Sequence, residues 1–195
     1  MTEAKTPRIA PLARAEWTEA ARDVFAFWEG DEAREKGSRS NTMMTLANHP
    51  PLALASLDLG KYFILNSTLS PRQQKLIVLR VAHRYNSTYQ WGHNSLTARQ
   101  AGLTEAEIAA VRTGGSSPIW NREDRMLLTA VDQTCDGGKI DDAAWAELTA
   151  VMSCQQIMDL IHAAGYFTMV AWGLVAIGVQ LEDGLSLSGR ASKPE

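Results

Sequence analysis

Residues 70–102 read SPRQQKLIVLRVAHRYNSTYQWGHNSLTARQAG, and this stretch decides the fold. Ser70 and Gln73 form a Ser-x-x-Gln capping box around Pro71, which suits the first position of a helix. The apolar run LIVLRVA follows, so we expect this first helix to be buried.

A second helix is predicted directly after the first. Asn86 ends the first helix, and Ser87 with Gln90 repeats the capping-box spacing. The second helix carries a set of polar and aromatic residues, Tyr89, Trp91, His93 and Asn94. The two helices therefore face each other across a tight polar turn. We expect the chemistry of the protein at the corner where their polar side chains meet.

Length and charge bound the class of protein. A chain of 195 residues suits one domain, 1–195, with a well-filled core. Its 19 basic and 22 acidic residues give a net charge of −3, which favours neither nucleic acid nor an anionic membrane as a partner. We expect the partners to be a small-molecule substrate and further copies of the chain.

The two cysteines, Cys135 and Cys154, are too far apart in sequence for a CxxC pair. Two cysteines in a chain of this length, without a signal-like first segment, indicate a reducing compartment, so we expect a cytoplasmic protein. The cysteines and histidines have no metal-ligand spacing, and there is no glycine-rich phosphate loop. The sequence therefore predicts neither a metal nor a cofactor.

The N-terminal part of the chain is predicted to be an extended arm followed by helices. Residues 1–11 form the arm, and an amphipathic helix follows from Glu16 to Trp28. The charged run GDEAREKGSRS is predicted to be a loop or a frayed turn. A short helix begins at Asn41, and another helix spans residues 51–65.

Helix-start signals continue through the rest of the chain. They precede apolar helical patterns at Thr104, Asn121, Asp141 and Ser153. No segment shows a sustained strand alternation. The sequence therefore predicts an all-α, multi-helix bundle.

One helical segment carries no charge. Residues 163–179 read AAGYFTMVAWGLVAIGV, which is at the lower margin of the length needed for a membrane span. The glycines and the lack of basic flanks favour a core or subunit-interface helix. We therefore expect a homo-oligomer and no membrane insertion.

Four segments in order carry a family resemblance: NTMMTLANHP (41–50), LSPRQQKLIVLRVA (69–82), YQWGHN (89–94) and AGLTEAEI (101–108). Over residues 40–185 the chain resembles the carboxymuconolactone decarboxylase family, which includes the alkylhydroperoxidase D-like proteins. The resemblance implies an all-helical fold, a trimer, hexamer or dimer of identical chains, and a pocket at the helix pair. It also implies either a cofactor-independent decarboxylase of a lactone acid or a peroxidase with a CxxC pair.

The chain departs from this family at the residues that do its chemistry. The resemblance implies glutamates where the chain has Lys75 and Gln90, and a histidine where it has Asn94. The cysteines of the peroxidase branch fall at Ser87 and Gln90, and neither side chain supplies a thiolate. Peroxidase activity is therefore not expected.

Two residues are candidate catalytic groups. His93 lies beside Gln90 and Asn94 on the second helix and carries a side chain suited to proton transfer near neutral pH. The alternative for His93 is a hydrogen-bonded histidine at a subunit boundary. Lys75 lies among apolar residues, where burial lowers a lysine pKa, and is either a base or a carboxylate anchor. The alternative for Lys75 is an exposed side chain in the first turn.

The remaining candidates are predicted to bind substrate, and they are Arg80, Ser87, Tyr89, Gln90, Trp91 and Asn94. Arg80 either holds a substrate carboxylate or pairs with an acidic neighbour. Tyr89 and Trp91 either wall an apolar pocket or pack in the core. Ser87 and Gln90 either cap the second helix or contact the substrate.

These residues favour a cofactor-independent lyase or isomerase that moves a proton on a small carboxylated metabolite derived from a ring, as in aromatic catabolism. Such a reaction needs a cation for the carboxylate, a group that moves the proton, and apolar walls that exclude water. The alternative, from a different class, is a non-catalytic binding or assembly protein of the same fold.

Overall fold

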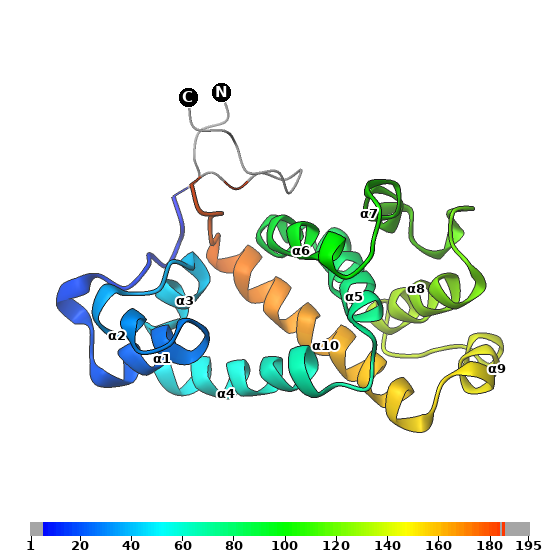
Figure 1. Cartoon of the computed structure of the whole chain (residues 1–195), viewed down its shortest axis with the longest axis horizontal. Helices are drawn as coiled ribbons and strands as arrows, with labels where there is room; N and C mark the ends of the chain where they lie inside the picture. The colour runs from blue at the N-terminus through cyan, green and yellow to red at the C-terminus, as the bar shows by residue number, and fades with distance from the viewer. Residues whose placement is uncertain (1–5, 184, 186–195) are drawn as a thin grey trace.

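The computed structural model describes residues 6–183 and residue 185, and within them the chain forms ten α-helices and no β-strand (Figure 1). This confirms the all-α prediction. The helices are α1 (Glu19–Glu29), α2 (Glu32–Lys36), α3 (Asn41–Leu46), α4 (Pro50–Lys61), α5 (Pro71–Arg84), α6 (Thr88–Gln100), α7 (Glu105–Ala110), α8 (Arg122–Cys135), α9 (Asp142–Val151) and α10 (Cys154–Ile177).

Helix α5 lies at the centre of the packing. It contacts α6, α8 and α10, and every side chain from Leu76 to Ala82 is buried. Figure 1 shows α10 crossing the molecule obliquely, with α1–α3 at one end and α7–α9 at the other. The predicted helix pair is therefore the core of the fold, and α10 packs across it.

Most of the predicted helix starts are confirmed. Ser70, Thr104 and Ser153 each form a complete capping box with the residue three positions later. Asn121 and Asp141 each accept a hydrogen bond from the third backbone N–H after them. These caps involve only neighbouring residues, so local sequence is enough to predict them.

The predicted capping box at Ser87 is wrong. Ser87 does precede α6, but its side chain makes no cap hydrogen bond, and its buried Oγ atom has no partner within the part of the chain that the structure describes. Gln90 is also buried, and its Nε2 donates to the carbonyl oxygen of Phe167 on α10, at 3.1 Å. Gln90 thus bonds to α10 instead of capping the start of α6.

The N-terminal helices differ in part from the prediction. Helix α1 begins at Glu19, capped by Thr18, and the predicted loop contains the short helix α2. Helix α2 forms because Ala33 is buried against α1 and because Arg34 pairs with Glu19, at 3.1 Å. Within the predicted arm, residues 6–11 contain no helix, whereas residues 1–5 lie outside the described residues.

The segment after α4 is fixed to α10 by a buried carboxylate. Residues 62–66 form a π-helical turn, and Asp159 on α10 accepts hydrogen bonds from the hydroxyl of Tyr62 and the backbone N–H of Thr68, at 2.8 and 2.7 Å. Burial raises the pKa of Asp159, but these donors outweigh burial and leave its pKa below the usual value. Close by, Gly60 packs against Tyr166, where a Cβ atom would lie 2.3 Å from the tyrosine hydroxyl.

Helix α10 is the one described helix long and apolar enough to cross a membrane. The central helix of a packed core passes the same test, so this is weak evidence for membrane insertion. In this fold α10 contacts α5, α6, α8 and α9.

Candidate active site

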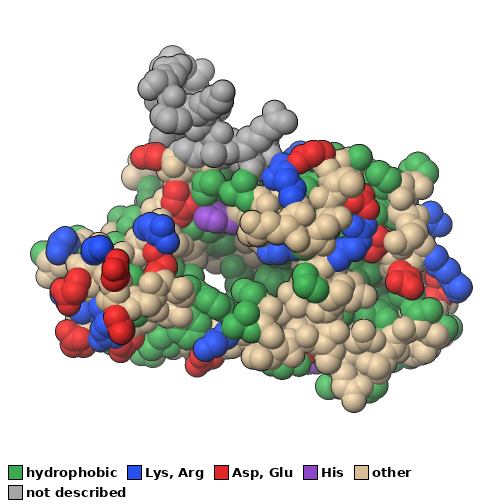
Figure 2. Space-filling view, in the orientation of Figure 1, with side chains coloured by type: hydrophobic (Ala, Val, Ile, Leu, Met, Phe, Trp, Pro, Cys, Tyr) green, Lys and Arg blue, Asp and Glu red, His purple; other side chains and the backbone are tan. Residues whose placement is uncertain are grey.

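A cavity of about 690 Å³ lies between α1, α3, α4, α5, α6 and α10. Figure 2 shows a hollow on this face of the molecule, with hydrophobic side chains along its edge. Apolar residues form most of its wall, among them Leu57, Ile64, Val78, Phe167, Val170 and Leu174. The cavity has the size and polarity of a small-molecule site.

Lys75 brings an amine into this cavity from the second turn of α5. Its Nζ donates to Oδ1 of Asn94 on α6, at 2.9 Å. Burial lowers the pKa of Lys75, and among the described residues no carboxylate pairs with it to oppose that shift. An uncompensated amine in an apolar cavity is a characteristic of functional lysines.

Asn94 and Gln90 continue the polar strip along α6. Asn94 donates from Nδ2 to the backbone carbonyl of Gln90, at 2.9 Å, so its Oδ1 is directed to Lys75. The Oε1 atom of Gln90 is buried and has no hydrogen-bond partner within the described part of the chain. Gln90 also lines the cavity, and a buried acceptor without a partner is a group that a bound ligand can satisfy.

The side chain of His93 is held in place by Glu182 and Tyr89, two contacts that the sequence did not predict. Its Nε2 lies 2.6 Å from Oε2 of Glu182, and its ring stacks on Tyr89 with 4.5 Å between ring centroids. Oε1 of Glu182 accepts from the hydroxyl of Tyr89 at 2.5 Å and from the backbone N–H of Asn41 at 2.7 Å. A histidine fixed through one ring nitrogen by a carboxylate presents the other, here Nδ1, for proton transfer.

The carboxylate of Glu182 is strongly stabilised. Burial raises its pKa, but the hydrogen bonds from His93, Tyr89 and Asn41 outweigh burial and lower the pKa to about 2. The pKa of Tyr89 changes in the opposite direction, because burial and the hydrogen bond to Glu182 raise it to about 12. Glu182 is therefore an anion at neutral pH.

Sequence reasoning missed Glu182 because no local signal marks it. It follows α10 and is 89 residues from His93 in the chain. No helical spacing or motif connects the two, and only the path of α10 across the α5–α6 pair brings them together.

Five of the eight predicted site residues line the cavity, and they are Lys75, Tyr89, Gln90, His93 and Asn94. Arg80, Ser87 and Trp91 do not. Ser87 and Trp91 line a smaller pocket of about 180 Å³, where the guanidinium of Arg112 lies 4.4 Å from the Trp91 ring centre.

Arg80 points away from the cavity and is committed to other partners. Its Nε lies 2.6 Å from Oδ1 of Asp132, and its Nη1 donates to the backbone carbonyl of Val111, at 3.0 Å. Arg80 is five residues after Lys75, which places it about 140° further around α5. Of its two predicted roles, the structure places it in the ion pair.

The cysteines lie outside the cavity lining. Cys135 is partly buried with Sγ 3.8 Å from the Thr168 hydroxyl, and burial raises its thiol pKa, whereas Cys154 is exposed. Within residues 6–183 and 185, no three His, Cys, Asp or Glu side chains are grouped so that they could hold a metal ion.

Comparison with known proteins supports the family resemblance. The carboxymuconolactone decarboxylase family model matches residues 50–131. The alkylhydroperoxidase AhpD core structure of an uncharacterized peroxidase-related protein from Ralstonia eutropha JMP134 has a TM-score of 0.78 at 14% identity, covering 98% of this chain and 99% of that one. An uncharacterized peroxidase-related protein from Silicibacter sp. TM1040 has a TM-score of 0.77 at 17% identity, covering 98% and 100%.

Residues 50–131 thus match the carboxymuconolactone decarboxylase family in sequence, and the whole chain shares its fold with AhpD-like proteins. A third structure of this fold is the debrominase Bmp8 in complex with 2,3,4-tribromopyrrole, with a TM-score of 0.72 at 17% identity over 92% of this chain and 94% of that one. At these identities the structural likeness concerns the fold alone. No curated protein matches the chain.

The contact between Lys75 and Asn94 joins two positions that the family resemblance implies are catalytic. These are the positions at which the family resemblance implies a glutamate and a histidine, and here the two replacements are hydrogen-bonded to each other. In this chain the two positions therefore supply an amine and an amide, in place of the acid and the base that the resemblance implies.

Proposed function

We propose that the protein is a cofactor-independent lyase or isomerase that moves a proton on a small carboxylated metabolite derived from a ring. One observation carries this proposal: the apolar cavity holds an amine that pairs with no carboxylate among the described residues and, on the same polar edge, a histidine oriented by a glutamate. These groups match what such a reaction needs, namely a cation, a proton carrier and walls that exclude water.

The two titratable groups have separable tasks. The amine of Lys75 meets the anionic or electron-rich part of the substrate, because no acidic residue in the described part of the chain neutralises it. His93 moves the proton, because Glu182 fixes the orientation of its ring. Positioned acid-base catalysis of this kind is typically worth about 10²–10⁴-fold in rate.

A structural neighbour supports a ring-sized ligand for this fold. Bmp8 is a debrominase, and its complex contains 2,3,4-tribromopyrrole, a small halogenated ring. A cavity of about 690 Å³ with apolar walls is large enough for a substituted ring of that size.

A non-catalytic binding protein is the second candidate. It is favoured by the loss of the family's acid-base residues at Lys75, Gln90 and Asn94 together. In that case the cavity would retain a ligand without converting it, and the His93–Glu182 contact would serve only to fix the chain after α10.

We also propose a homo-oligomer. Exposed apolar side chains recur along α10 at Met158, Met169, Trp172 and Val175. Their exposure in a single chain supports burial against another copy. Light scattering should give a mass above that of the 21.4 kDa monomer.

A metabolite thermal-shift screen, followed by turnover assays on the hits, tests the proposed reaction. Small ring-derived carboxylates should raise the melting temperature and be converted without an added cofactor. Lys75→Met should lose the shift, while Lys36→Met, which changes an exposed lysine outside the cavity, should keep it. Hits that bind at Lys75 and are never converted would favour the binding protein over the enzyme.

A further inference from the structure

We infer that Lys75 is a nucleophile that captures the carbonyl carbon of its substrate as an imine, and that the substrate class is a 3-oxo acid or a related ketone. This inference rests on the proposed function, because it names the substrate class of the same cavity. It gives the amine a covalent role, in place of a carboxylate anchor or a base.

The surroundings of Lys75 set it apart from the other cations of α5. Arg72, Arg80 and Arg84 each contact at least one carboxylate. The nitrogen of Lys75 instead contacts a neutral amide oxygen, and it opens into an apolar cavity. A paired cation is fixed as a charge, whereas an amine held only by an amide can lose its proton and react.

Burial acts on the protonation state in the direction that this chemistry requires. The pKa of Lys75 is lowered by burial, which raises the share of free amine at neutral pH. Desolvation in an apolar pocket is a known way to activate a lysine for attack on carbonyl compounds. Asn94 Oδ1 accepts one N–H and so helps to orient the nitrogen lone pair.

The reaction balances without an oxidant or a cofactor. The Lys75 nitrogen attacks the carbonyl carbon, the carbonyl electron pair moves to oxygen, and a proton passes from nitrogen to that oxygen to give a neutral carbinolamine. The carbinolamine takes up one proton from solvent and loses water, which gives a protonated imine. In a 3-oxo acid the bond to the carboxylate then breaks, CO₂ leaves, and the electron pair forms an enamine. A proton from His93 reaches the enamine carbon, and water releases the ketone and regenerates the amine.

Gln90 has a place in this sequence. Its buried Oε1 lacks a partner among the described residues, although the atom belongs to a cavity-lining side chain. The carbinolamine hydroxyl is a donor that forms only during the reaction, and Oε1 is an acceptor suited to it.

Reductive trapping tests the inference. The protein is incubated at pH 7 with 4-formylbenzoate, a carboxylated ring with a carbonyl group, together with cyanoborohydride, and the modified lysines are mapped by peptide mass spectrometry. We expect clearly higher occupancy at Lys75 than at exposed Lys36, because burial lowers the pKa of Lys75 and so raises its share of free amine at pH 7. Equal occupancy at Lys36 and Lys75, or none at Lys75, would overturn the inference.

Two variants make the result independent of folding. Lys36→Met should keep the labelling at Lys75, and Lys75→Met should remove it while circular dichroism reports the helical content. If Lys75→Met does not fold, the peptide map of the unmodified protein still decides the question, because it compares two lysines in one sample.

The experiment separates this inference from the proposed function. Adducts at Lys75 with no turnover of any 3-oxo acid would keep the imine and defeat the lyase. Turnover of a screening hit that cyanoborohydride neither traps nor inhibits would keep the lyase and overturn the imine, leaving Lys75 as an anchor or base.

Discussion

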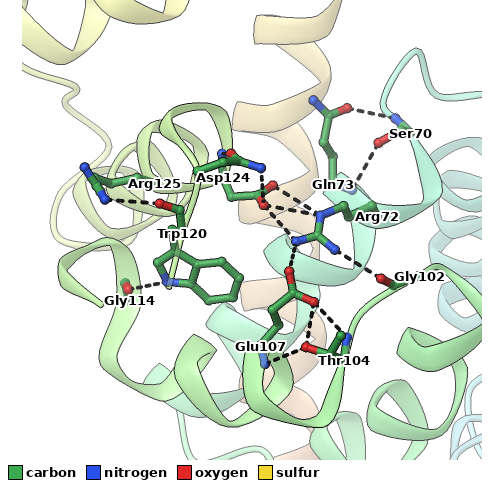
Figure 3. Close-up of polar contacts among 11 residues, drawn as sticks. Ser70, Arg72, Gln73, Gly102, Thr104, Glu107, Gly114, Trp120, Asp124 and Arg125 are labelled. Carbon is green, nitrogen blue, oxygen red and sulfur yellow. Dashed lines mark hydrogen bonds and ion pairs between the residues drawn. The ribbon is translucent and has the colours of Figure 1, made fainter. Parts of the chain in front are cut away.

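The two sides of the α5–α6 pair treat charge in opposite ways. On the side that faces α7 and α8, the cations of α5 are matched by acids: Arg72 contacts Asp124, at 2.8 Å, and also Glu107 (Figure 3). On the cavity side, Lys75 contacts the amide oxygen of Asn94, and it pairs with no carboxylate among the residues that the structure describes. The same helix therefore carries a saturated ionic network on one face and an uncompensated amine on the other.

This difference indicates which charges serve folding and which serve function. Removing one member of a buried ion pair leaves the other charge unpaired and is strongly destabilising. Removing a cation that has no partner takes away a desolvation cost instead. Mutations on the two faces should thus change stability in opposite directions, while activity should depend on the cavity face alone.

The largest effect is expected at His93. His93→Gln should lower kcat by about 10²–10⁴-fold and leave substrate binding nearly unchanged, because it removes the positioned proton carrier. Steady-state kinetics on a screening hit measures both quantities. His162→Gln is the matched control, since this histidine is exposed and lies outside the cavity. Unchanged turnover in His93→Gln would remove the residue from the mechanism.

On the opposite face, Asp132→Ala should cost stability and not activity. Asp132 is the carboxylate that pairs with Arg80, whose side chain is only 11% exposed, and it also contacts Arg84. Its loss should lower the free energy of unfolding by about 3 kcal/mol. Urea denaturation measures this change, with Asp136→Ala, an exposed partner of Arg84, as the control that should change little. Similar small effects in both variants would contradict the structural reading of this face.

Comparison of these two faces also shows how far the sequence could predict the molecule. Helix starts at Ser70, Thr104 and Ser153 were predictable because a capping box closes within four residues. The sequence could not predict which face of α5 contacts acidic residues, because the partners of Arg80 and Lys75 lie 52 and 19 residues away in the chain. The family resemblance predicted some of the residues of α5 and α6 that line the cavity. It could not predict which side chains they contact.

The errors have the same origin. Ser87 and Gln90 fit a capping box locally, yet burial of both residues and the contact of Gln90 with α10 decide their conformation. Glu182 lies in a segment without helical periodicity, so only the tertiary arrangement shows that it orients His93.

A pH-dependent effect is expected at Glu182. Its pKa in the folded protein, about 2, is below the ordinary value of 4.5, so its contribution to stability is complete above pH 4.5 and is lost as the pH falls toward 2. Glu182→Gln should therefore destabilise the protein by about 1–3 kcal/mol at pH 7, and the difference from the parent should shrink on acidification below pH 4.5. Thermal unfolding of both proteins across this pH range measures the gap. A difference independent of pH would show that ionic bonding is not its cause.

The smallest effect on stability, with the opposite sign, is expected at Lys75. Its lowered pKa means that the unfolded state binds the proton more tightly, so stability rises with pH between the folded pKa and the ordinary value of 10.5. At pH 7 the buried ammonium is a cost, and Lys75→Met should raise the melting temperature slightly while activity is lost. A lower melting temperature would place Lys75 among the structural cations with Arg72 and Arg80.

The protonation of Lys75 itself is the most direct test of the account. Side-chain NMR of the lysine amines can follow each titration, and the resonance that disappears in Lys75→Met is that of Lys75. An uncompensated amine in the cavity predicts a titration midpoint clearly below the ordinary lysine value of 10.5. A midpoint at or above 10.5 would mean that the ammonium is compensated, and it would contradict the assignment of the cavity face as the reactive side of the α5–α6 pair.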